Sequence, residues 1–327
     1  MHIPENYLSP ATCAVATVAM VPVWAAAARH VRDEVPRDKV PLIGVAAAFS
    51  FLSMMFNIPL PGGTTGHAVC GTLIAILFGP WSAVLAISIA LAIQAVFFGD
   101  GGILSLGANC FNMAFVLPFV GFAVYEFLRG RLKGPKGELV AAGVGSYVGL
   151  NTAALLCALE FGIQPMLFHD ASGAALYCPY PIQVAVPAMM LGHLTVAGLA
   201  EAGFTVGILA FLKGTAPDFG VKTSGTGSIA PVAGLVLALV AACPLGLLAT
   251  GDAWGEWAAE DLAEMVGYTP SGLAEGWEWS SLMPDYAVGA LPEWLGYVIS
   301  AVVGVALLVI IFRLASGAAR PAVDFDA

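Results

Sequence analysis

Residues 57–79, NIPLPGGTTGHAVCGTLIAILFG, decide how the chain folds, because they place a glycine-rich loop directly before a short apolar segment. The three glycines between positions 62 and 66 permit positive φ angles and let the backbone approach a neighbouring helix closely. The apolar segment, residues 68–79, ends at a Gly-Pro pair and is too short to cross about 30 Å of hydrocarbon alone. We therefore expect it to pack beside the loop, among longer helices.

The rest of the chain is strongly apolar. Hydrophobic residues make up 59% of its 327 residues, charged residues make up 10%, and the mean hydropathy is +0.87. A water-soluble domain of this length would not tolerate so apolar a surface, so we expect an integral membrane protein. Together with residues 68–79, eight longer apolar stretches predict an all-α fold of about nine transmembrane or membrane-embedded helices: 8–28, 40–60, 80–98, 103–128, 139–161, 181–212, 229–250 and 295–314.

The basic residues predict the orientation of these segments, since cytoplasmic loops carry the excess of Lys and Arg. With nine segments and an extracytoplasmic N-terminus, all 12 basic residues fall on the inside. If residues 68–79 are not counted, the later clusters move to the opposite side. The clusters follow the first, fifth, seventh and ninth segments: Arg29, Arg32, Arg37 and Lys39; Arg129, Arg131, Lys133 and Lys136; Lys213 and Lys222; Arg313 and Arg320.

The N-terminus, Met1-His2, carries a set of metal-binding nitrogens. The Met1 α-amine, the His2 amide nitrogen and the His2 imidazole can close two fused chelate rings around one ion, which leaves one in-plane position open. All-nitrogen coordination suits Ni(II) or Cu(II), and can accept Co(II), far better than Mg(II) or Ca(II). The alternative is a histidine at position 2 by chance, in a terminus that frays in solvent.

The glycine-rich loop supplies a second histidine, His67, which the predicted topology places on the same outer face as His2. The loop can present this imidazole at a fixed angle beside a helix end. A simple re-entrant turn with His67 bonded to a carbonyl is the alternative. The pairing of two outward-facing histidines favours the metal site.

Three segments carry a family resemblance: Met1–Pro10 (MHIPENYLSP), residues 57–71, and residues 99–114 (GDGGILSLGANCFNMA). They resemble the substrate-binding membrane component of cobalt and nickel energy-coupling-factor transporters, the CbiM and NikM family, over roughly residues 1–212. The resemblance implies that Met1, His2 and His67 hold Co2+ or Ni2+ as transported substrate, without an organic cofactor.

The resemblance also implies partners. They are a transmembrane coupling subunit of CbiQ or NikQ type and ATP-binding subunits of CbiO or NikO type, in the cytoplasmic membrane of a prokaryote. Nucleic acid is not expected to bind.

We expect the N-terminus to stay intact. Residues 1–10 contain no Lys or Arg and include Glu5, so the positive region of a cleavable signal peptide is missing. The initiator methionine is normally removed only before small residues, and His2 is large.

Polar residues near the three ligands are candidates to orient or admit the ion. Asn109 and Asn112 share a helix face and either support a histidine or join two helices by hydrogen bonds. Thr64 and Thr65 are expected to cap the short helix that follows them. Asp100 lies in a Gly-Asp-Gly-Gly turn, where turn geometry alone explains an Asp.

The other histidines are weaker candidates. His30 lies among cytoplasmic charges. His169 and Asp170, on an outer loop, either collect ions or belong to a plain loop. His193 and Glu201 lie within a predicted membrane span, where ionisable groups are functional by default, although a hydrogen bond between helices satisfies them equally well.

The C-terminal third forms a second unit. A flexible linker, residues 213–228, precedes a two-helix unit, residues 229–327, whose outer loop 251–294 holds nine acidic residues and no basic one. The stretch 244–262 resembles the small CbiN-like accessory subunit. An acidic loop concentrates dications, or it is acidic only because basic residues are kept inside.

The chain has no GxxxxGK[ST] phosphate loop, so we expect partners, not this chain, to hydrolyse ATP. The predicted function is a Co2+ or Ni2+ capture component, not an enzyme. A self-sufficient secondary transporter predicts an internal repeat and midplane charges, of which only Glu160, Glu201 and His193 are candidates. A Cu(II)-binding membrane module is chemically harder to exclude, because Cu(II) outranks nickel and cobalt for nitrogen ligands.

Overall fold

The computed structural model describes residues 1–220 and 229–318. Seven helical segments in these ranges are long and apolar enough to cross a membrane. The shorter helices α2 (Val40–Met54) and α3 (Gly71–Phe78) bring the described helices of the bundle to the nine expected. The all-α membrane fold is thus confirmed. Most of the expected linker, residues 221–228, lies outside the described residues, as do Lys222 and Arg320.

The first half of the core is built around α1 (Pro10–Glu34) and α4 (Pro80–Ile93). The Ser9 hydroxyl caps α1 by accepting a hydrogen bond from the Thr12 amide at 3.1 Å, and Pro10 occupies the first turn, where no amide donor is needed. A π-helical turn, η1 (Gln94–Phe98), continues α4 to the functional region. Such turns re-aim side chains and often occur at functional sites.

The loop before α3 differs from the sequence-based expectation. The second apolar segment stops being helical at Met54, and a β-hairpin follows, in which β1 (Ile58–Leu60) pairs antiparallel with β2 (Thr64–Gly66). Gly62 and Gly63 form its turn with φ angles of 92° and 78°. The expected capping by Thr64 and Thr65 is wrong, because both lie in β2 and Cys70 occupies the N-cap position of α3.

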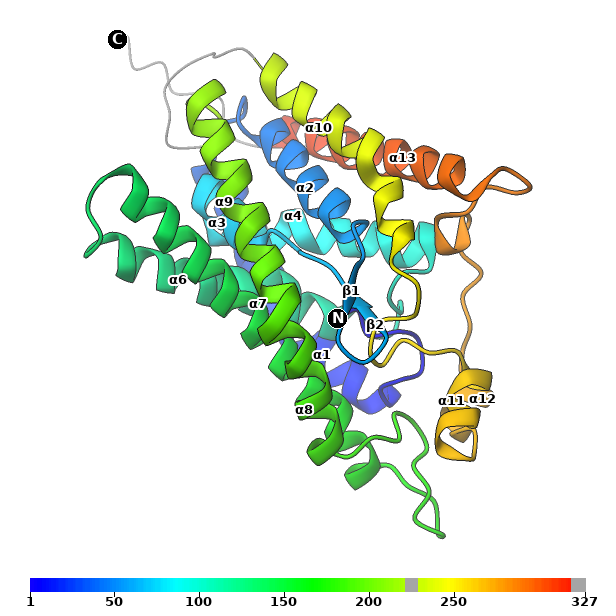
Figure 1. The fold of residues 1–327 in the computed structure, drawn as a ribbon. Coiled ribbons are helices and arrows are strands. Elements are labelled where there is room, and N and C mark those ends of the chain that lie inside the picture. Colours follow the sequence, from blue (N-terminus) through cyan, green and yellow to red (C-terminus); the bar gives the residue numbers. More distant parts are fainter. Residues whose placement is uncertain (221–228, 319–327) are drawn as a thin grey trace.

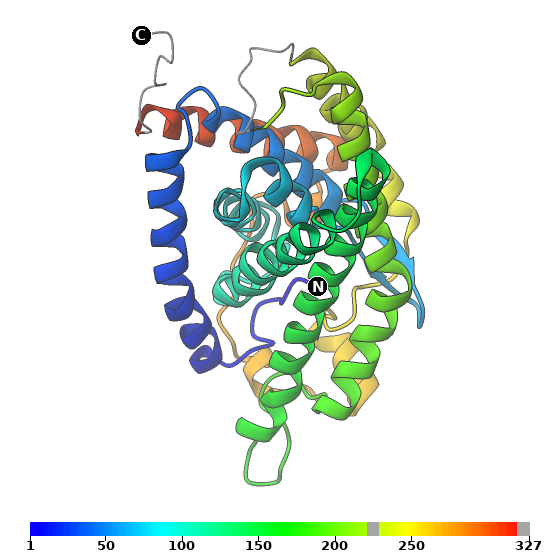
Figure 2. The same ribbon diagram turned by 90° about the vertical axis from the view of Figure 1, so that its left-hand side faces the viewer.

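The second half of the core consists of long helices packed through small residues. Gly121 and Gly145 let α6 (Leu117–Arg129) and α7 (Gly134–Leu167) touch, since a Cβ at Gly145 would lie 2.5 Å from the Gly121 carbonyl oxygen. Figure 2 shows α7 running across the middle of the bundle beside α9 (Gly198–Thr215), which lies on the side opposite to α1. The elements are α5 (Leu106–Asn109), η2 (Cys110–Val116), α6 (Leu117–Arg129), α7 (Gly134–Leu167), α8 (Ile182–Gly192), η3 (His193–Ala197) and α9 (Gly198–Thr215).

The C-terminal unit packs on the core rather than standing apart from it (Figure 1). Helix α13 (Glu293–Ala315) lies against α2, where Gly304 leaves room for the ring of Phe51. The acidic loop runs back along the core toward the N-terminal segment. The remaining elements are α10 (Ala230–Ala242), η4 (Cys243–Leu248), α11 (Ala259–Val266), α12 (Ser271–Ala274), η5 (Pro284–Tyr286) and η6 (Ser316–Ala318).

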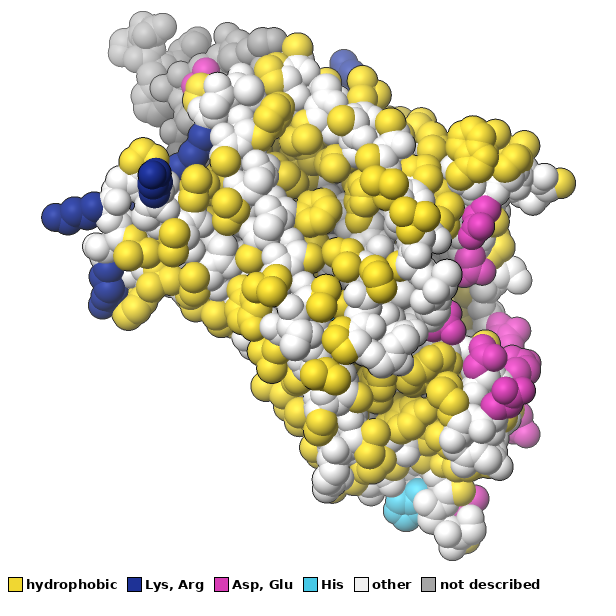
Figure 3. All heavy atoms as spheres, in the orientation of Figure 1, with side chains coloured by type: hydrophobic (Ala, Val, Ile, Leu, Met, Phe, Trp, Pro, Cys, Tyr) yellow, Lys and Arg dark blue, Asp and Glu magenta, His cyan; other side chains and the backbone are white. Residues whose placement is uncertain are grey.

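Charge is separated along the molecule. On the face shown in Figure 3, Lys and Arg side chains gather at one end of the bundle, whereas Asp and Glu gather over the acidic loop. This separation agrees with the predicted orientation, and the extracytoplasmic position of the N-terminus remains a prediction.

Candidate metal site

The N-terminal segment is buried. It turns from the start of α1 into the middle of the bundle (Figure 2), and Met1, His2 and Ile3 are 3%, 2% and 0% exposed. The N-terminus is therefore buried and does not fray in solvent. The free amine and the first histidine lie at the centre of the protein.

Residues 102–109 hold this segment through its backbone. Asn109 accepts a hydrogen bond from the Ile3 amide at 2.8 Å and donates one to the Ile3 carbonyl at 3.0 Å. The Ser105 hydroxyl and the Gly102 amide donate to the same carbonyl, at 2.6 and 2.9 Å. Gly102 must lack a side chain, because a Cβ there would lie 2.7 Å from the Glu5 amide nitrogen. Main-chain contacts therefore fix the path of the terminus independently of its side chains.

Two further contacts fix the segment at either side of Ile3. The Glu5 carboxylate accepts a hydrogen bond from the Ile103 amide at 2.6 Å, and burial raises the pKa of this carboxyl. The Cys157 thiol of α7 lies 3.8 Å from the Met1 carbonyl as a weak donor. The position of Met1 is thus set by both the 102–109 segment and α7.

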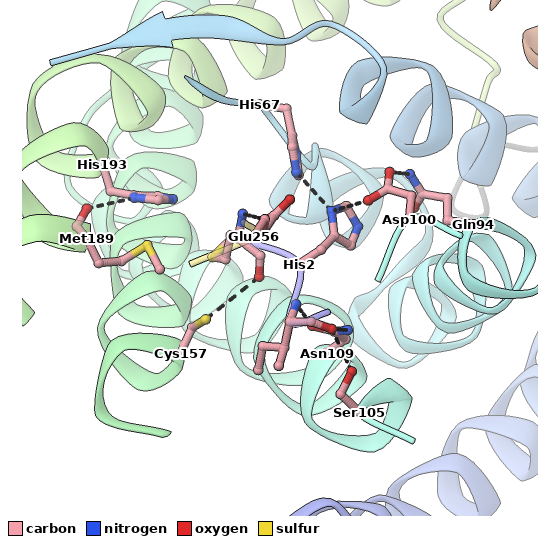
Figure 4. Close-up of polar contacts among 12 residues, drawn as sticks. His2, His67, Gln94, Asp100, Ser105, Asn109, Cys157, Met189, His193 and Glu256 are labelled. Atoms are coloured by element: carbon pink, nitrogen blue, oxygen red, sulfur yellow. Dashed lines mark hydrogen bonds and ion pairs between the residues drawn. The ribbon is translucent and has the colours of Figure 1, made fainter. Parts of the chain in front are cut away.

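The two histidines meet as the sequence predicts. His67 Nε2 lies 3.2 Å from His2 Nδ1, and the ring centroids are 4.9 Å apart (Figure 4). His67 Nδ1 lies 3.2 Å from the Ala68 carbonyl, which places the proton on Nδ1 and leaves the Nε2 lone pair free. Adjacent nitrogens around an ion with bonds of about 2.0–2.1 Å are about 2.9 Å apart, close to this separation.

Two carboxylates flank the nitrogens. The Met1 amine donates to Glu256 Oε1 at 3.0 Å, and Asp100 Oδ1 lies 3.1 Å from His2 Nδ1. Asp100 Oδ2 in turn accepts hydrogen bonds from the Tyr286 hydroxyl at 2.5 Å and from the side-chain amide of Gln94 at 3.1 Å. Asp100 therefore contacts His2 and Tyr286 in addition to forming its turn. Glu256 and Tyr286 both belong to the C-terminal unit.

The charges around the site favour neutral His67. Burial, together with the neighbouring terminal ammonium and His2, holds the pKa of His67 well below its usual range. Burial disfavours the charged Met1 amine, but Glu256, Cys157 and Asp100 together outweigh burial, and the pKa of this amine is raised. His67 is thus ready to bind a metal, whereas the amine must release a proton first.

The site opens to a cavity of about 670 Å³ beside the two histidines. Its wall includes Asp252, Asp285 and Glu293 of the C-terminal unit as well as Asp100. These three carboxylates of the acidic loop are exposed to solvent, so they border the open side of the cavity. Over the described residues, no group of three or more His, Cys, Asp and Glu side chains forms a metal site by itself.

The other candidates have structural partners elsewhere. Asn112 donates to Glu160 Oε2 at 2.7 Å and so joins two helices. His193 Nδ1 lies 2.8 Å from the Met189 carbonyl within its own helix, and His169 lies on an exposed turn. Thr65 is buried in β2, where its amide donates to the Asp252 carbonyl at 3.2 Å.

Three residues at the site were not singled out by sequence reasoning: Gln94, Glu256 and Tyr286. Glu256 was one of nine acidic residues in a long loop, and nothing in the sequence distinguished it from the others. Gln94 carried a weak signal, as a polar residue within an apolar span.

Comparison with known proteins decides the family. Residues 2–219 match the sequence profile described as CbiM, the cobalt uptake substrate-specific transmembrane region. The chain belongs to the CbiM family. Residues 230–320 match the PDGLE domain, so this CbiM family member carries a second domain in the same chain.

Relatives of this CbiM family member include proteins that align with it over nearly their whole length. It is 50% identical to the fused nickel transport protein NikMN of Rhodobacter capsulatus, and the alignment covers 97% of each chain. It is 44% identical to the probable fused nickel transport protein LarMN of Lactiplantibacillus plantarum, over 96% of this chain and 97% of the relative. These relatives are named as transport proteins, so the chain is a transporter component rather than an enzyme.

The fold of the core also matches a solved structure. The crystal structure of a transition metal transporter superposes with a TM-score of 0.62 at 51% identity, covering 65% of this chain and 93% of that one. The similarity is high enough to support the same arrangement of the membrane helices.

Proposed function

We propose that the chain captures Ni2+ or Co2+ for an ATP-driven energy-coupling-factor importer in the cytoplasmic membrane of a prokaryote. One ion is bound by the Met1 amine, the His2 amide and imidazole, and His67 Nε2. The observation that carries the proposal is the 3.2 Å approach of His67 Nε2 to His2 Nδ1 at a buried free terminus. Planar nitrogen coordination is the geometry that Ni(II) prefers and Co(II) accepts.

The relatives support nickel first and cobalt second. The fused relatives, which match nearly the whole chain at 44–50% identity, are named as nickel transport proteins. The relatives named as cobalt transport proteins align with the core at 28–35% identity. Nickel is therefore the ion to test first.

Energy for import comes from partners in this proposal. The chain contains no phosphate-binding loop. A CbiQ- or NikQ-like coupling subunit and CbiO- or NikO-like ATP-binding subunits would turn the loaded core, residues 1–212, toward the cytoplasm. The accessory unit, residues 229–327, joins the core after the 213–228 linker and supplies Glu256 and Tyr286 to the site.

The first test compares the native N-terminus with one extended by a single residue before Met1. Purified native protein should hold one Ni(II) per chain with the absorption spectrum of planar nitrogen coordination, and the extended protein should lose it. Equal binding by both forms would show that the terminus is not a ligand.

A second test concerns the rival transport mechanism. Uptake into vesicles should require the ATP-binding subunits and ATP, and uptake by this chain alone would favour a secondary transporter. Competition between Ni(II) and Cu(II) during uptake, rather than during binding alone, separates the nickel importer from a copper-binding module, because Cu(II) binds nitrogen ligands more tightly in any case.

A further inference from the structure

Glu201 is a carboxylic acid in the interior of the membrane bundle. It lies in α9, within the apolar segment Ile182–Thr215, and its side chain is completely buried. A buried ionisable group in a membrane protein is costly and needs partners. Its Oε2 accepts hydrogen bonds from the Val69 amide at 2.7 Å and the Cys70 amide at 2.9 Å. Among the described residues, its other oxygen has no hydrogen-bond partner.

These two amides belong to the residues directly before α3, which begins at Gly71. The first amides of a helix lack partners within the helix, and an oxygen of the N-cap side chain usually accepts from them. Here Cys70 is the N-cap residue, has a left-handed backbone with φ of 60°, and makes no side-chain capping bond. Glu201, from a different helix, therefore holds the amides of the two residues that lead into α3, whereas a capping side chain would accept from the amides of Thr72 or Leu73.

The opposite side of the same segment is held by α2. The Ser50 hydroxyl donates to the Val69 carbonyl at 2.7 Å, and the Ser53 hydroxyl donates to the Ala68 carbonyl at 3.3 Å. Residues 68–70 are therefore held between α2 on one side and α9 on the other. Each of these contacts is buried.

This held segment sets the direction of the His67 imidazole. Its Nδ1 faces the Ala68 carbonyl, which is itself fixed by Ser53, and its Nε2 points to His2. A displacement of residues 68–70 would therefore move Nε2 away from His2. Figure 4 shows the His67 ring reaching from the segment before α3 to the buried terminus.

We propose that Glu201 is a positioning residue for His67, which acts by fixing the residues directly before α3 and thereby the fourth metal-binding nitrogen. The inference rests on the proposed function, since it assigns Glu201 to the same site. Because both amides bind one carboxylate oxygen, the carbonyl oxygen of a glutamine can accept both. Glu201→Gln should therefore keep the position of His67, and Glu201→Ala should lose it.

The experiment measures Ni(II) affinity and absorption spectra of the full chain in detergent for three variants of α9. Glu201→Ala should weaken binding about 10- to 100-fold, which is the usual effect of removing a group that orients a ligand, and should shift the absorption band. Glu201→Gln should stay near the native values. Thr205→Val is the matched control, because Thr205 is completely buried one turn further along α9 and makes no hydrogen bond within the described chain.

A double-mutant cycle with His67→Ala tests whether Glu201 acts through His67. In the His67→Ala background, Glu201→Ala should cause no further loss of affinity. An equal loss in both backgrounds, or native affinity and spectrum in folded Glu201→Ala, would overturn the proposal. If Glu201→Ala does not fold, Glu201→Asp replaces it in these measurements, because the shorter Asp side chain moves the acceptor oxygen away from the two amides.

A measurement without metal separates this inference from the proposed function. If the native chain binds no Ni(II), the proposed function fails. The His67 imidazole resonances of ¹⁵N-histidine-labelled protein would still report its position, and they should shift in Glu201→Ala but not in Thr205→Val. Unchanged resonances would overturn the positioning role of Glu201 by themselves.

Discussion

At the scale of single residues, Asn109 and Asn112 show how neighbours in sequence can have different roles. Asn109 binds the amide and the carbonyl of Ile3 and so holds the N-terminal segment in place. Asn112 binds Glu160 on another helix. The sequence placed both on one helix face, but a π-helical turn begins directly after Asn109 and each side chain finds its own partner.

We predict opposite effects for the two alanine substitutions. Asn109→Ala should lower Ni(II) affinity about 10- to 100-fold, because the terminus loses the group that orients it. Asn112→Ala should leave the affinity near the native value and lower stability by about 1–3 kcal/mol, since it leaves a buried carboxyl without its partner. Isothermal titration and thermal unfolding measure the two quantities. Equal affinity losses in both variants would contradict the assignment.

At the scale of elements, the β-hairpin joins the core to the acidic loop. The Thr65 amide donates to the Asp252 carbonyl at 3.2 Å, and the backbones touch where Gly251 has φ of 102°. A Cβ at Gly251 would lie 2.6 Å from the Gly63 carbonyl oxygen. Neither backbone can move without disturbing the contact between hairpin and loop.

We therefore expect Gly251→Ala to separate the loop from the hairpin. Hydrogen exchange at the Thr65 amide should accelerate at least about tenfold, equivalent to ~1.4 kcal/mol. Gly267→Ala is the control, because Gly267 has a similar φ of 83° but no atom within 4 Å of its Cβ position. Acceleration of Thr65 exchange by both variants would show that backbone strain, rather than the contact with Gly63, is responsible.

At the scale of the whole molecule, the C-terminal unit completes the site of the core. Glu256 binds the Met1 amine, and Tyr286 binds the carboxylate that faces His2. Tyr286 also stacks on Phe98 at a centroid distance of 4.8 Å, which fixes its hydroxyl beside Asp100. One acidic and one aromatic side chain thus connect the C-terminal unit to the candidate metal site.

We predict that the double variant Glu256→Gln/Tyr286→Phe lowers Ni(II) affinity about 10- to 100-fold, because the loss of the groups that orient the Met1 amine and Asp100 outweighs the easier deprotonation of the amine without Glu256. Removal of residues 220–327 should have about the same effect if the unit acts through these two contacts. Glu260→Gln is the control, since it removes the same charge from an exposed position of the same loop. A similar loss in Glu260→Gln would show that the overall charge of the loop, rather than Glu256, attracts the ion.

The sequence by itself determined the membrane fold, the family and the two histidines. Apolar segment lengths reflect the thickness of the bilayer, and a chelating terminus is a local property of two residues, so both can be predicted without tertiary contacts. The short helix α3 could be predicted for a different reason, because the distribution of basic residues requires one more segment. The β-hairpin was missed, since its polar turn lies next to a long apolar run.

Only the tertiary structure decided which distant polar residues contact the terminus, Asp100 and the segment that carries His67. Glu256, Tyr286 and Glu201 are 132 to 255 positions away from their partners in the sequence, and acidic or aromatic residues elsewhere in the chain have the same local pattern. Helix packing and the path of the acidic loop select these three. The physical reason is that a hydrogen bond depends on distance and direction in space, which local sequence patterns do not specify.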